Sequence, residues 1–303
     1  MEIGQAKKIF FISKKAQNVT ERTKETYEEV LKKFVVYAVD NDTYDVSAVT
    51  SDMIRGFLGS LKTKGMRGIT VHRYFRTLRT FFLFLYREDY VQKNPMATVK
   101  PPKVEKKIMR TFTAQEINKL LNAFNKNEFF GMRNYVIMCM FFSTGIRKME
   151  LAALKMADIN ITNDLLRIQH GKGQKERFVP LGRTMRRVLI QFMKMREEYV
   201  GDEVCLWLFP SRAKKQMGAS GLSILFQKVK KELKMTGEKV SAHTWRHTFA
   251  KNYLLNGGDI FSLQTILGHA NIETTRGYIA LNQNELKTQM AKFNPLDNKD
   301  WLY

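Results

Sequence analysis

The chain has 303 residues and a formal net charge of +22, from 51 Lys and Arg residues against 29 Asp and Glu residues. This excess favours a nucleic-acid partner, because a basic surface attracts polyanions. A merely basic protein and a membrane-surface protein stay open as alternatives.

Cys139 and Cys205 are far apart and indicate neither a disulfide framework nor a cysteine-based metal site. The apolar runs at 9–12 and 135–142 are too short for a signal-peptide core and a membrane span respectively. We therefore expect a cytoplasmic protein, and the length favours two domains.

Residues 13–98 are expected to form an all-helical first domain. Apolar residues recur at spacings of three and four in three segments, which begin near Thr23, Ser51 and Thr70. Thr70 is the expected cap of the third helix, and Gly65 ends the second. No strand pattern interrupts this region.

The third helix carries three arginines on roughly one polar face. Arg73, Arg76 and Arg87 have no acidic residue near them in the sequence until Glu88. Such a face is often only solvated charge. On a chain this basic, it also favours contacts with nucleic-acid phosphates, and we expect Arg73 and Arg76 to make them.

Residues 99–110 are expected to form a linker, because Pro101-Pro102 disfavours helix and the following lysines keep the segment solvated. The second domain, 111–303, opens on the capping-box pattern Thr113-Ala-Gln-Glu116. Two short β-prone runs around a Gly-rich turn predict a hairpin over 165–180, with Lys172 at its tip. Helical patterns are expected near 133–143, 184–199, 220–233, 243–255 and 260–267. The fold class is therefore mainly α with a small antiparallel β-sheet.

The second domain also carries chemically suggestive residues. Arg147 lies in Thr144-Gly-Ile-Arg-Lys-Met-Glu150, and His243 and Arg246 are spaced to share one helix face. Two arginines suit a phosphate, because a guanidinium presents planar, permanently charged donors. Gly268 permits a left-handed helix end, so His269 would follow a fixed turn, and Asp259 is expected to cap the helix that this turn ends. The phenol of Tyr278 is a candidate nucleophile.

Taken singly, each of these residues has an ordinary explanation: a lone histidine is usually packed or on the surface, and so is one tyrosine among 11. Their joint spacing is improbable by chance. With it, nearly the whole chain resembles the tyrosine site-specific recombinases, the family of lambda integrase, Cre and the Xer-type enzymes. The resemblance implies a two-domain DNA clamp, in which 13–98 is a SAM-like core-binding domain and 111–303 a catalytic domain.

The resemblance also implies roles for individual residues. The residues that match the catalytic positions of the family are Arg147, Lys172, His243, Arg246, His269 and Tyr278. Glu150 would support Arg147, His247 would be a buried supporting residue, and Lys175 and Arg177 are further candidates for DNA contacts. Tyr278 would attack a DNA phosphodiester and form a 3′-phosphotyrosyl link, and Lys172 would protonate the leaving 5′-hydroxyl. No metal ion or other cofactor is expected, since the arginines supply the positive charge.

The implied partner is double-stranded DNA with inverted-repeat core sites, bound by a synaptic tetramer in the nucleoid. The tail, about 284–303, has apolar residues at helical spacing and is expected to dock on a neighbouring protomer, unless it packs on its own domain.

We expect an integrase or transposase of a mobile element. We expect no separate arm-binding domain before the first helical block, and the tail does not look typical of Xer-type enzymes. Length and motif spacing favour Xer-type dimer resolution as the alternative. A type IB-like topoisomerase and a non-catalytic DNA-binding protein are further alternatives.

Overall fold

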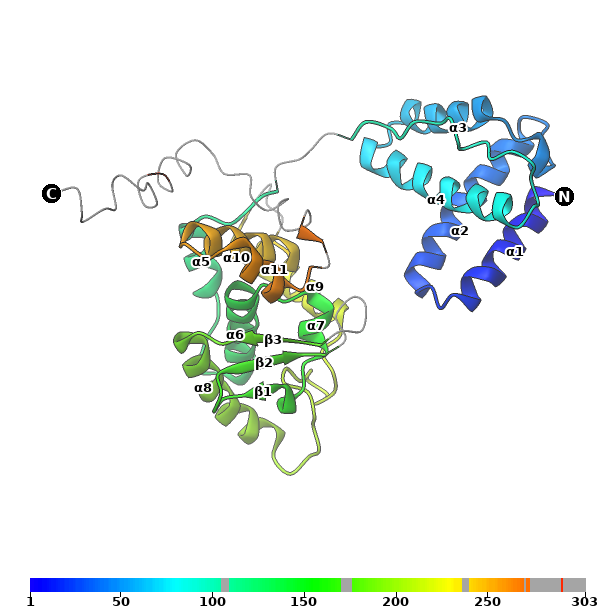
Figure 1. Ribbon diagram of the computed structural model, residues 1–303. Helices are drawn as coiled ribbons and strands as arrows, with labels where there is room; N and C mark the ends of the chain where they lie inside the picture. Colours follow the sequence, from blue (N-terminus) through cyan, green and yellow to red (C-terminus); the bar gives the residue numbers. More distant parts are fainter. Residues whose placement is uncertain (105–108, 170–175, 236–239, 270, 273–289, 291–303) are drawn as a thin grey trace. The chain divides into compact units, whose positions relative to one another are not determined.

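The computed structural model describes residues 1–104, 109–169, 176–235, 240–269, 271, 272 and 290. The chain divides into two compact units, Met1–Lys107 and Ile108–Tyr303 (Figure 1). Across the ranges that the structure describes, every helix is too short or too polar to cross a membrane.

The first unit is entirely helical. Its long last helix, α4, packs against each of the other three α-helices, and a 3₁₀ turn, η1, joins the second helix to the third. The elements are α1 (Ile3–Ala16), α2 (Glu21–Val39), η1 (Val46–Ala48), α3 (Ser51–Thr63) and α4 (Gly68–Arg87). α4 begins at Gly68 and not at Thr70, so the expected cap was wrong: Arg67 is the N-cap residue and Thr70 lies within the first turn.

The first helix, α1, was not expected from the sequence, which placed the start of the domain at residue 13. Ile3, Ala6 and Phe10 recur at spacings of three and four and are buried in the core of the unit. The ring of Phe10 packs edge-on against Phe81 and Phe84 of α4. The polar residues between them dilute the apolar pattern of α1, but its buried stripe is the stripe of an amphipathic helix.

The segment after α4 stays in contact with the first unit over more residues than the sequence indicated. Ser51 Oγ donates to the carbonyl oxygen of Pro95 at 2.7 Å, and Arg55 Nη2 donates to Thr98 Oγ1 at 3.2 Å. Val99, the expected first residue of the linker, is 7% exposed and belongs to the core. The described chain therefore leaves this core after Val99.

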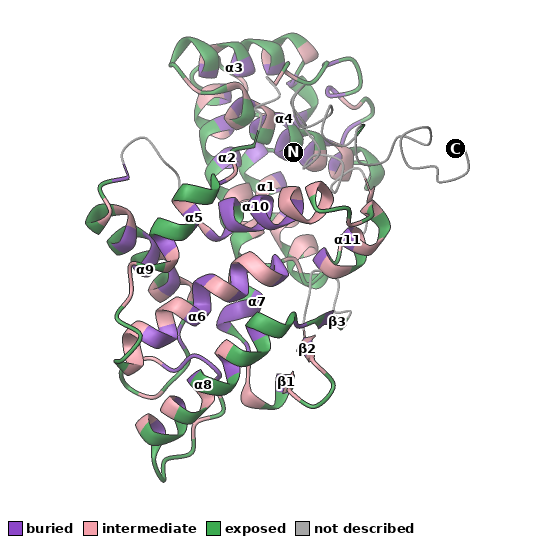
Figure 2. Ribbon diagram, turned by 90° about the vertical axis from the view of Figure 1, so that its left-hand side faces the viewer, coloured by how far each residue is buried: buried purple, intermediate pink, exposed green. Residues whose placement is uncertain are grey.

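The second unit is mostly helical with one small sheet (Figure 1). Its first elements are α5 (Ala114–Leu121), α6 (Phe129–Thr144), α7 (Lys148–Ala152), η2 (Met156–Asp158), β1 (Ile159–Asn160), β2 (Leu165–Ile168) and β3 (Arg177–Pro180). They are followed by α8 (Arg183–Val200), α9 (Ala219–Glu232), α10 (Ala242–Leu255) and α11 (Ile260–Leu267). α6 packs against α5, α8 and α10, and most of the first half of α10 is buried (Figure 2).

The described part of the sheet has three antiparallel strands in the order β1-β2-β3. The predicted hairpin is confirmed as the pairing of β2 with β3, in which Leu166 lies opposite Val179. Side chains alternate between the two faces of a strand, so Leu166, Ile168 and Val179 enter the core together. The two-residue strand β1 was not expected, because a run this short has no periodicity to detect.

The predicted start of α5 and both predicted ends of α11 are confirmed. Thr113 and Glu116 form the capping box of α5, and the carboxylate of Asp259 accepts hydrogen bonds from the first backbone amides of α11. Gly268 adopts the left-handed conformation, with φ of 65°. α11 packs beside β3, so this helix end lies next to the sheet.

Candidate active site

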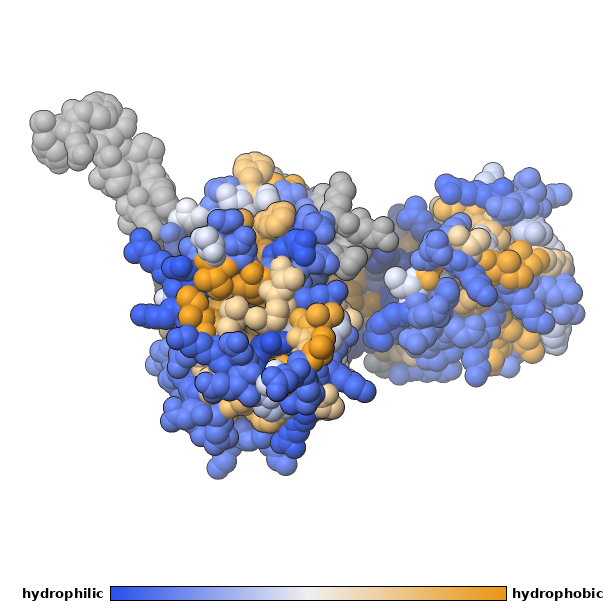
Figure 3. Space-filling view, turned by 90° about the horizontal axis from the view of Figure 1, so that it is seen from below, coloured by the Kyte–Doolittle hydropathy of each residue, from blue (hydrophilic) through white to orange (hydrophobic). Residues whose placement is uncertain are grey.

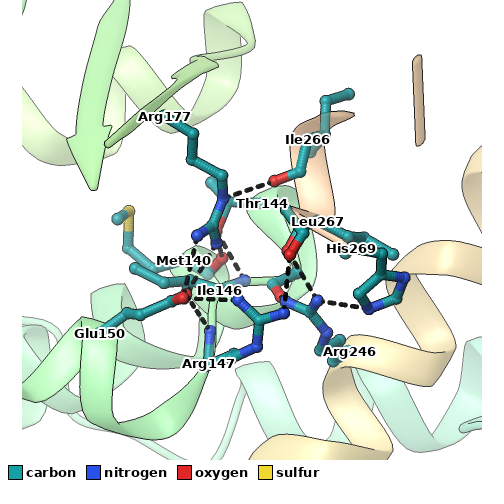
Figure 4. Close-up of polar contacts among 12 residues, drawn as sticks. Met140, Thr144, Ile146, Arg147, Glu150, Arg177, Arg246, Ile266, Leu267 and His269 are labelled. Carbon is teal, nitrogen blue, oxygen red and sulfur yellow. Dashed lines mark hydrogen bonds and ion pairs between the residues drawn. The ribbon is translucent and has the colours of Figure 1, made fainter. Parts of the chain in front are cut away.

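Four parts of the second unit bring polar side chains to one place: the turn between α6 and α7, strand β3, helix α10 and the end of α11 (Figure 4). α6 ends at Gly145, whose φ is 60°. This left-handed residue reverses the chain, so Arg147 becomes the N-cap residue of α7 and Glu150 lies in its first turn. The carboxylate and the arginine that the sequence paired are therefore held by one tight turn.

Glu150 lies between two arginines. Its Oε1 accepts a hydrogen bond from Arg147 Nη1 at 2.7 Å, and its Oε2 accepts one from the Arg147 backbone amide at 2.9 Å. Arg177 of β3 approaches both oxygens, with Nη1 at 2.9 Å from Oε1 and Nη2 at 2.7 Å from Oε2. Glu150 is only 6% exposed; burial raises the pKa of its carboxyl, but the two guanidinium groups outweigh that effect and lower it to about 2. Glu150 is therefore a carboxylate at neutral pH, suited to orienting arginines and not to transferring protons.

Arg246 of α10 is 2% exposed and donates to backbone carbonyls from two distant parts of the chain. Its Nη1 lies 2.6 Å from the oxygen of Gly145, and its Nη2 lies 2.8 Å from the oxygen of Leu267. The same Nη2 lies 2.8 Å from Nε2 of His269. Arg246 therefore connects the turn before Arg147 with the turn that carries His269.

His269 is neutral at physiological pH. Burial lowers the pKa of its imidazole to about 4, with further lowering from the charges of Arg246, Arg147 and Arg177. Because a guanidinium can only donate, the Nε2 that faces Arg246 must accept, which assigns the ring proton to Nδ1. His269 is thus a hydrogen-bond donor through Nδ1.

The end of α11 accepts hydrogen bonds from three different arginines (Figure 4). Ile266 O accepts from Arg177 Nε at 2.9 Å, Leu267 O from Arg246 Nη2 at 2.8 Å, and Gly268 O from Arg147 Nη2 at 3.0 Å. The last carbonyls of a helix lack partners within the helix and carry partial negative charge, so cations bind there favourably. Arg147, Glu150, Arg177, Arg246 and His269 consequently form one connected network.

Two further histidines, His243 and His247, lie on α10. His243 is exposed in the first turn, and its ring meets that of His247 edge-on at 5.6 Å between centroids. His247 is buried, as expected; burial lowers the pKa of its imidazole to about 4, and the nearby His243 and Arg246 add to this effect. His247 is therefore a neutral base at physiological pH.

The structure brings together Arg147, Glu150, Arg246 and His269, and it places His243 and His247 on the helix of Arg246. The remaining candidates of this unit, Lys172, Lys175 and Tyr278, lie outside the described residues.

Arg177 is placed differently from the expectation that it contacts DNA. Its side chain is 10% exposed and points to Glu150 and Ile266. The sequence contained a signal for this position: Arg177 is two residues before the buried Val179, so a strand places both on the inward face.

Arg73 and Arg76 lie in the first unit and line a groove of about 530 Å³ between α2 and α4. Arg22 and His72 add to its basic lining, and the groove also contains several threonines. Arg73 has an acidic neighbour that the sequence did not reveal: its Nη2 lies 3.1 Å from both carboxylate oxygens of Glu29, on α2. The ion pair fixes the guanidinium at the edge of the groove.

Hydrophilic side chains cover most of the face of each unit seen in Figure 3, with apolar side chains in smaller patches.

Gly145→Ala is expected to destabilise the second unit and to weaken its function. A Cβ atom there would lie 2.5 Å from Phe249 and 2.7 Å from Leu267, in a backbone conformation that alanine disfavours. Strain and overpacking together should cost about 2–4 kcal/mol, and they would move the carbonyl that binds Arg246. Gly65→Ala is the control, because Gly65 also has a positive φ, of 77°, but no atom within 4 Å of the new Cβ. Thermal unfolding of both variants should show the larger loss for Gly145; equal losses would contradict the packing argument.

Comparison with known protein families gives two matches in this chain. Residues 110–285 match the Phage integrase family, and residues 14–89 match the N-terminal SAM-like domain of phage integrases. The first match covers the whole arginine network, and the second covers most of the helical unit.

Individual proteins are similar over nearly the full length. The tyrosine recombinase XerC of Syntrophus aciditrophicus is 31% identical over 92% of this chain and 93% of its own length. The tyrosine recombinase XerD of Staphylococcus haemolyticus is 28% identical over 92% of this chain and 94% of its own. Among solved structures, the integrase of the transposon Tn1549, in complex with a circular intermediate DNA, has the same fold, with a TM-score of 0.77 and 19% identity. That comparison covers 96% of this chain and 99% of the other.

Proposed function

Because the chain belongs to the phage integrase family of tyrosine recombinases, we propose that it cuts and rejoins double-stranded DNA through a 3′-phosphotyrosyl intermediate on Tyr278. The observation that supports this most is the network of Arg147, Arg246 and His269 around the end of α11. Phosphoryl transfer needs fixed positive charge where the non-bridging oxygens gain charge, and protein acceptors hold the two guanidinium groups of this network in place.

In the proposed reaction, the phenol of Tyr278 loses its proton to solvent, its oxygen forms a bond to the scissile phosphorus, and the bond from phosphorus to the 5′-oxygen breaks. Arg147 and Arg246 stabilise the charge on the non-bridging oxygens, with hydrogen bonds from His243 and from Nδ1 of His269. Lys172 donates the proton that the departing 5′-oxygen takes up. Attack by a 5′-hydroxyl on the phosphotyrosine reverses the sequence, so the phosphodiester is restored without an external energy source.

A nicked duplex that traps the cleaved state tests this function. The proposal predicts a covalent protein–DNA adduct on denaturing gels, whereas a non-catalytic DNA-binding protein gives none. A plasmid with two copies of the bound site then separates a recombinase from a topoisomerase, because only a recombinase excises or inverts the segment between the sites. Relaxed but unrecombined plasmid would contradict the proposal. The bound site itself is obtained by selection from genomic fragments.

We also propose that Arg73 and Arg76 bind DNA phosphates from the groove between α2 and α4. Each neutralised phosphate releases condensed counterions, so Arg76→Gln should weaken binding and reduce the slope of log K against log salt by roughly 0.9. Arg73→Gln should have a smaller effect, because Glu29 already neutralises part of its charge. Filter binding over a salt series measures both slopes. An unchanged slope for Arg76→Gln would show that the groove is not part of the DNA-binding surface.

We propose that the protein assembles as a tetramer on inverted-repeat sites through its tail, about 284–303. Leu286, Met290 and Phe293 recur at helical spacing there, and terminal apolar residues commonly bind a partner. Deleting the tail should preserve binding to one half-site and abolish cooperative binding to a paired site, as measured by gel shift and light scattering. Undiminished cooperativity would mean that other surfaces assemble the complex.

For the biological role, we propose integration or transposition of a mobile element, in the cytoplasm and on the nucleoid; the integrase of the transposon Tn1549, which has the same fold, is a precedent for this role. The similarity to XerC and XerD favours a second candidate, Xer-type resolution of chromosome or plasmid dimers. Sequencing the DNA that becomes covalently attached in the host distinguishes them. Adducts at the ends of an element support the first role, and adducts at a single chromosomal site support the second.

A further inference from the structure

Arg177 is the one arginine of the described network that matches none of the catalytic positions in the family resemblance. We propose that Arg177 is a positioning residue for DNA cleavage: it holds Glu150 and the end of α11, so that Arg147 and His269 keep the arrangement that binds the scissile phosphate. The proposal rests on the proposed function, since it concerns the same reaction.

The contacts of Arg177 support a role within the protein. Its Nη1 and Nη2 donate to the two oxygens of Glu150, and its Nε donates to Ile266 O, so each of its three nitrogens has a protein acceptor. Its side chain is also packed: a Cβ at Gly268 would lie 3.0 Å from Cδ of Arg177. Through these contacts the guanidinium joins β3 to both α7 and α11.

Charge balance explains why Arg147 alone would not suffice. Glu150 is a buried carboxylate, and a guanidinium that neutralises it completely is drawn toward it and away from any other anion. With Arg177 bound to both oxygens, Arg147 needs only Nη1 for Glu150, and its Nη2 reaches Gly268 O. Arg177 thereby leaves Arg147 oriented but not fully neutralised, as phosphate binding requires.

Arg177→Gln tests the proposal, with Arg167→Gln as its matched control. Arg167 lies on the neighbouring strand β2, and its Nε pairs with the buried carboxylate of Asp158 at 3.3 Å, outside the network. Adduct formation on the nicked duplex should fall on the order of 100-fold for Arg177→Gln, because a displacement of about 1 Å can cost that much. The control should stay within about threefold of the wild type, since it leaves the network intact.

The pH profile separates positioning from a general loss of structure. Glu150 faces Arg147 of α7 and Arg177 of β3, with Arg246 of α10 and His269 after α11 in the same network. Without Arg177, burial raises the pKa of Glu150 from its present value of about 2, so the carboxylate is lost as pH falls through the new pKa. Adduct formation by Arg177→Gln should therefore gain a limb that rises with pH and is absent from the wild type. The double variant with Arg177→Gln and Glu150→Gln should lack that limb. A limb caused by titration of His269 would persist in the double variant.

If Arg177→Gln does not fold, Arg177→Lys tests the proposal in its place. Lysine keeps the positive charge but cannot donate to both oxygens of Glu150 and to Ile266 at once, so the rate should fall without a new acid limb. A wild-type rate for either variant, with an unchanged pH profile, would overturn the proposed role of Arg177 but not the proposed function of the protein. If the wild-type protein itself formed no adduct, the proposed function and this role would be overturned together.

Discussion

Tyr278→Phe is expected to abolish the covalent protein–DNA adduct and to leave DNA affinity within about twofold of the wild type. The substitution removes one oxygen atom, so the attacking nucleophile is lost while the residues proposed to hold the phosphate are unchanged. Denaturing gels of a nicked substrate measure the adduct, and native gels measure binding.

Tyr253→Phe is the control for this substitution. Tyr253 lies on α10 of the same unit, where its ring packs against Phe249. The variant should form the adduct at the wild-type rate. A persistent adduct in Tyr278→Phe would assign the nucleophile to another residue.

Lys172→Ala is expected to slow cleavage by about 10²–10⁴-fold and to change binding little, because it removes the proposed general acid. A substrate with sulfur in place of the 5′-bridging oxygen should restore much of the rate, since a thiolate leaves without a proton. Single-turnover cleavage of the two substrates gives the comparison.

Lys175→Ala distinguishes a proton donor from a cation that only binds DNA. This lysine is three residues farther along the same predicted hairpin and is a candidate for a phosphate contact. Its loss should weaken binding, and the sulfur substrate should give it no selective rescue. Equal rescue of both variants would take the general-acid role away from Lys172.

Local signals in the sequence predicted most of the fold. α11 was predicted with its observed ends because Asp259 caps its start and Gly268 terminates it. The hairpin of β2 and β3 was predicted from β-prone runs around a Gly-rich turn. Where such signals were weak, the prediction missed the element: α1 has only a sparse apolar stripe, and β1 is two residues long.

The sequence indicated Arg147, Glu150, Arg246 and His269 as members of one site, but it did not indicate the contacts that connect them. Arg246 binds Gly145, 101 residues away, and Arg147 binds Gly268, 121 residues away. Spacing along the chain carries no information about which carbonyl a distant arginine reaches. For the same reason Arg73 was not paired with Glu29, and Arg177 was not paired with Glu150. A buried carboxylate gathers cations from any element that reaches it, and only the folded chain decides which these are.

If Tyr278 is the nucleophile, it becomes covalently joined to a 3′-phosphate of DNA. Mass spectrometry of the trapped adduct, after digestion with protease and nuclease, identifies the linkage. We expect a nucleotide attached through its 3′-phosphate to the peptide that contains Tyr278, with a free 5′-hydroxyl on the other DNA end. A nucleotide on another residue, a 5′-phosphate linkage, or cleaved DNA with no attached peptide would contradict it.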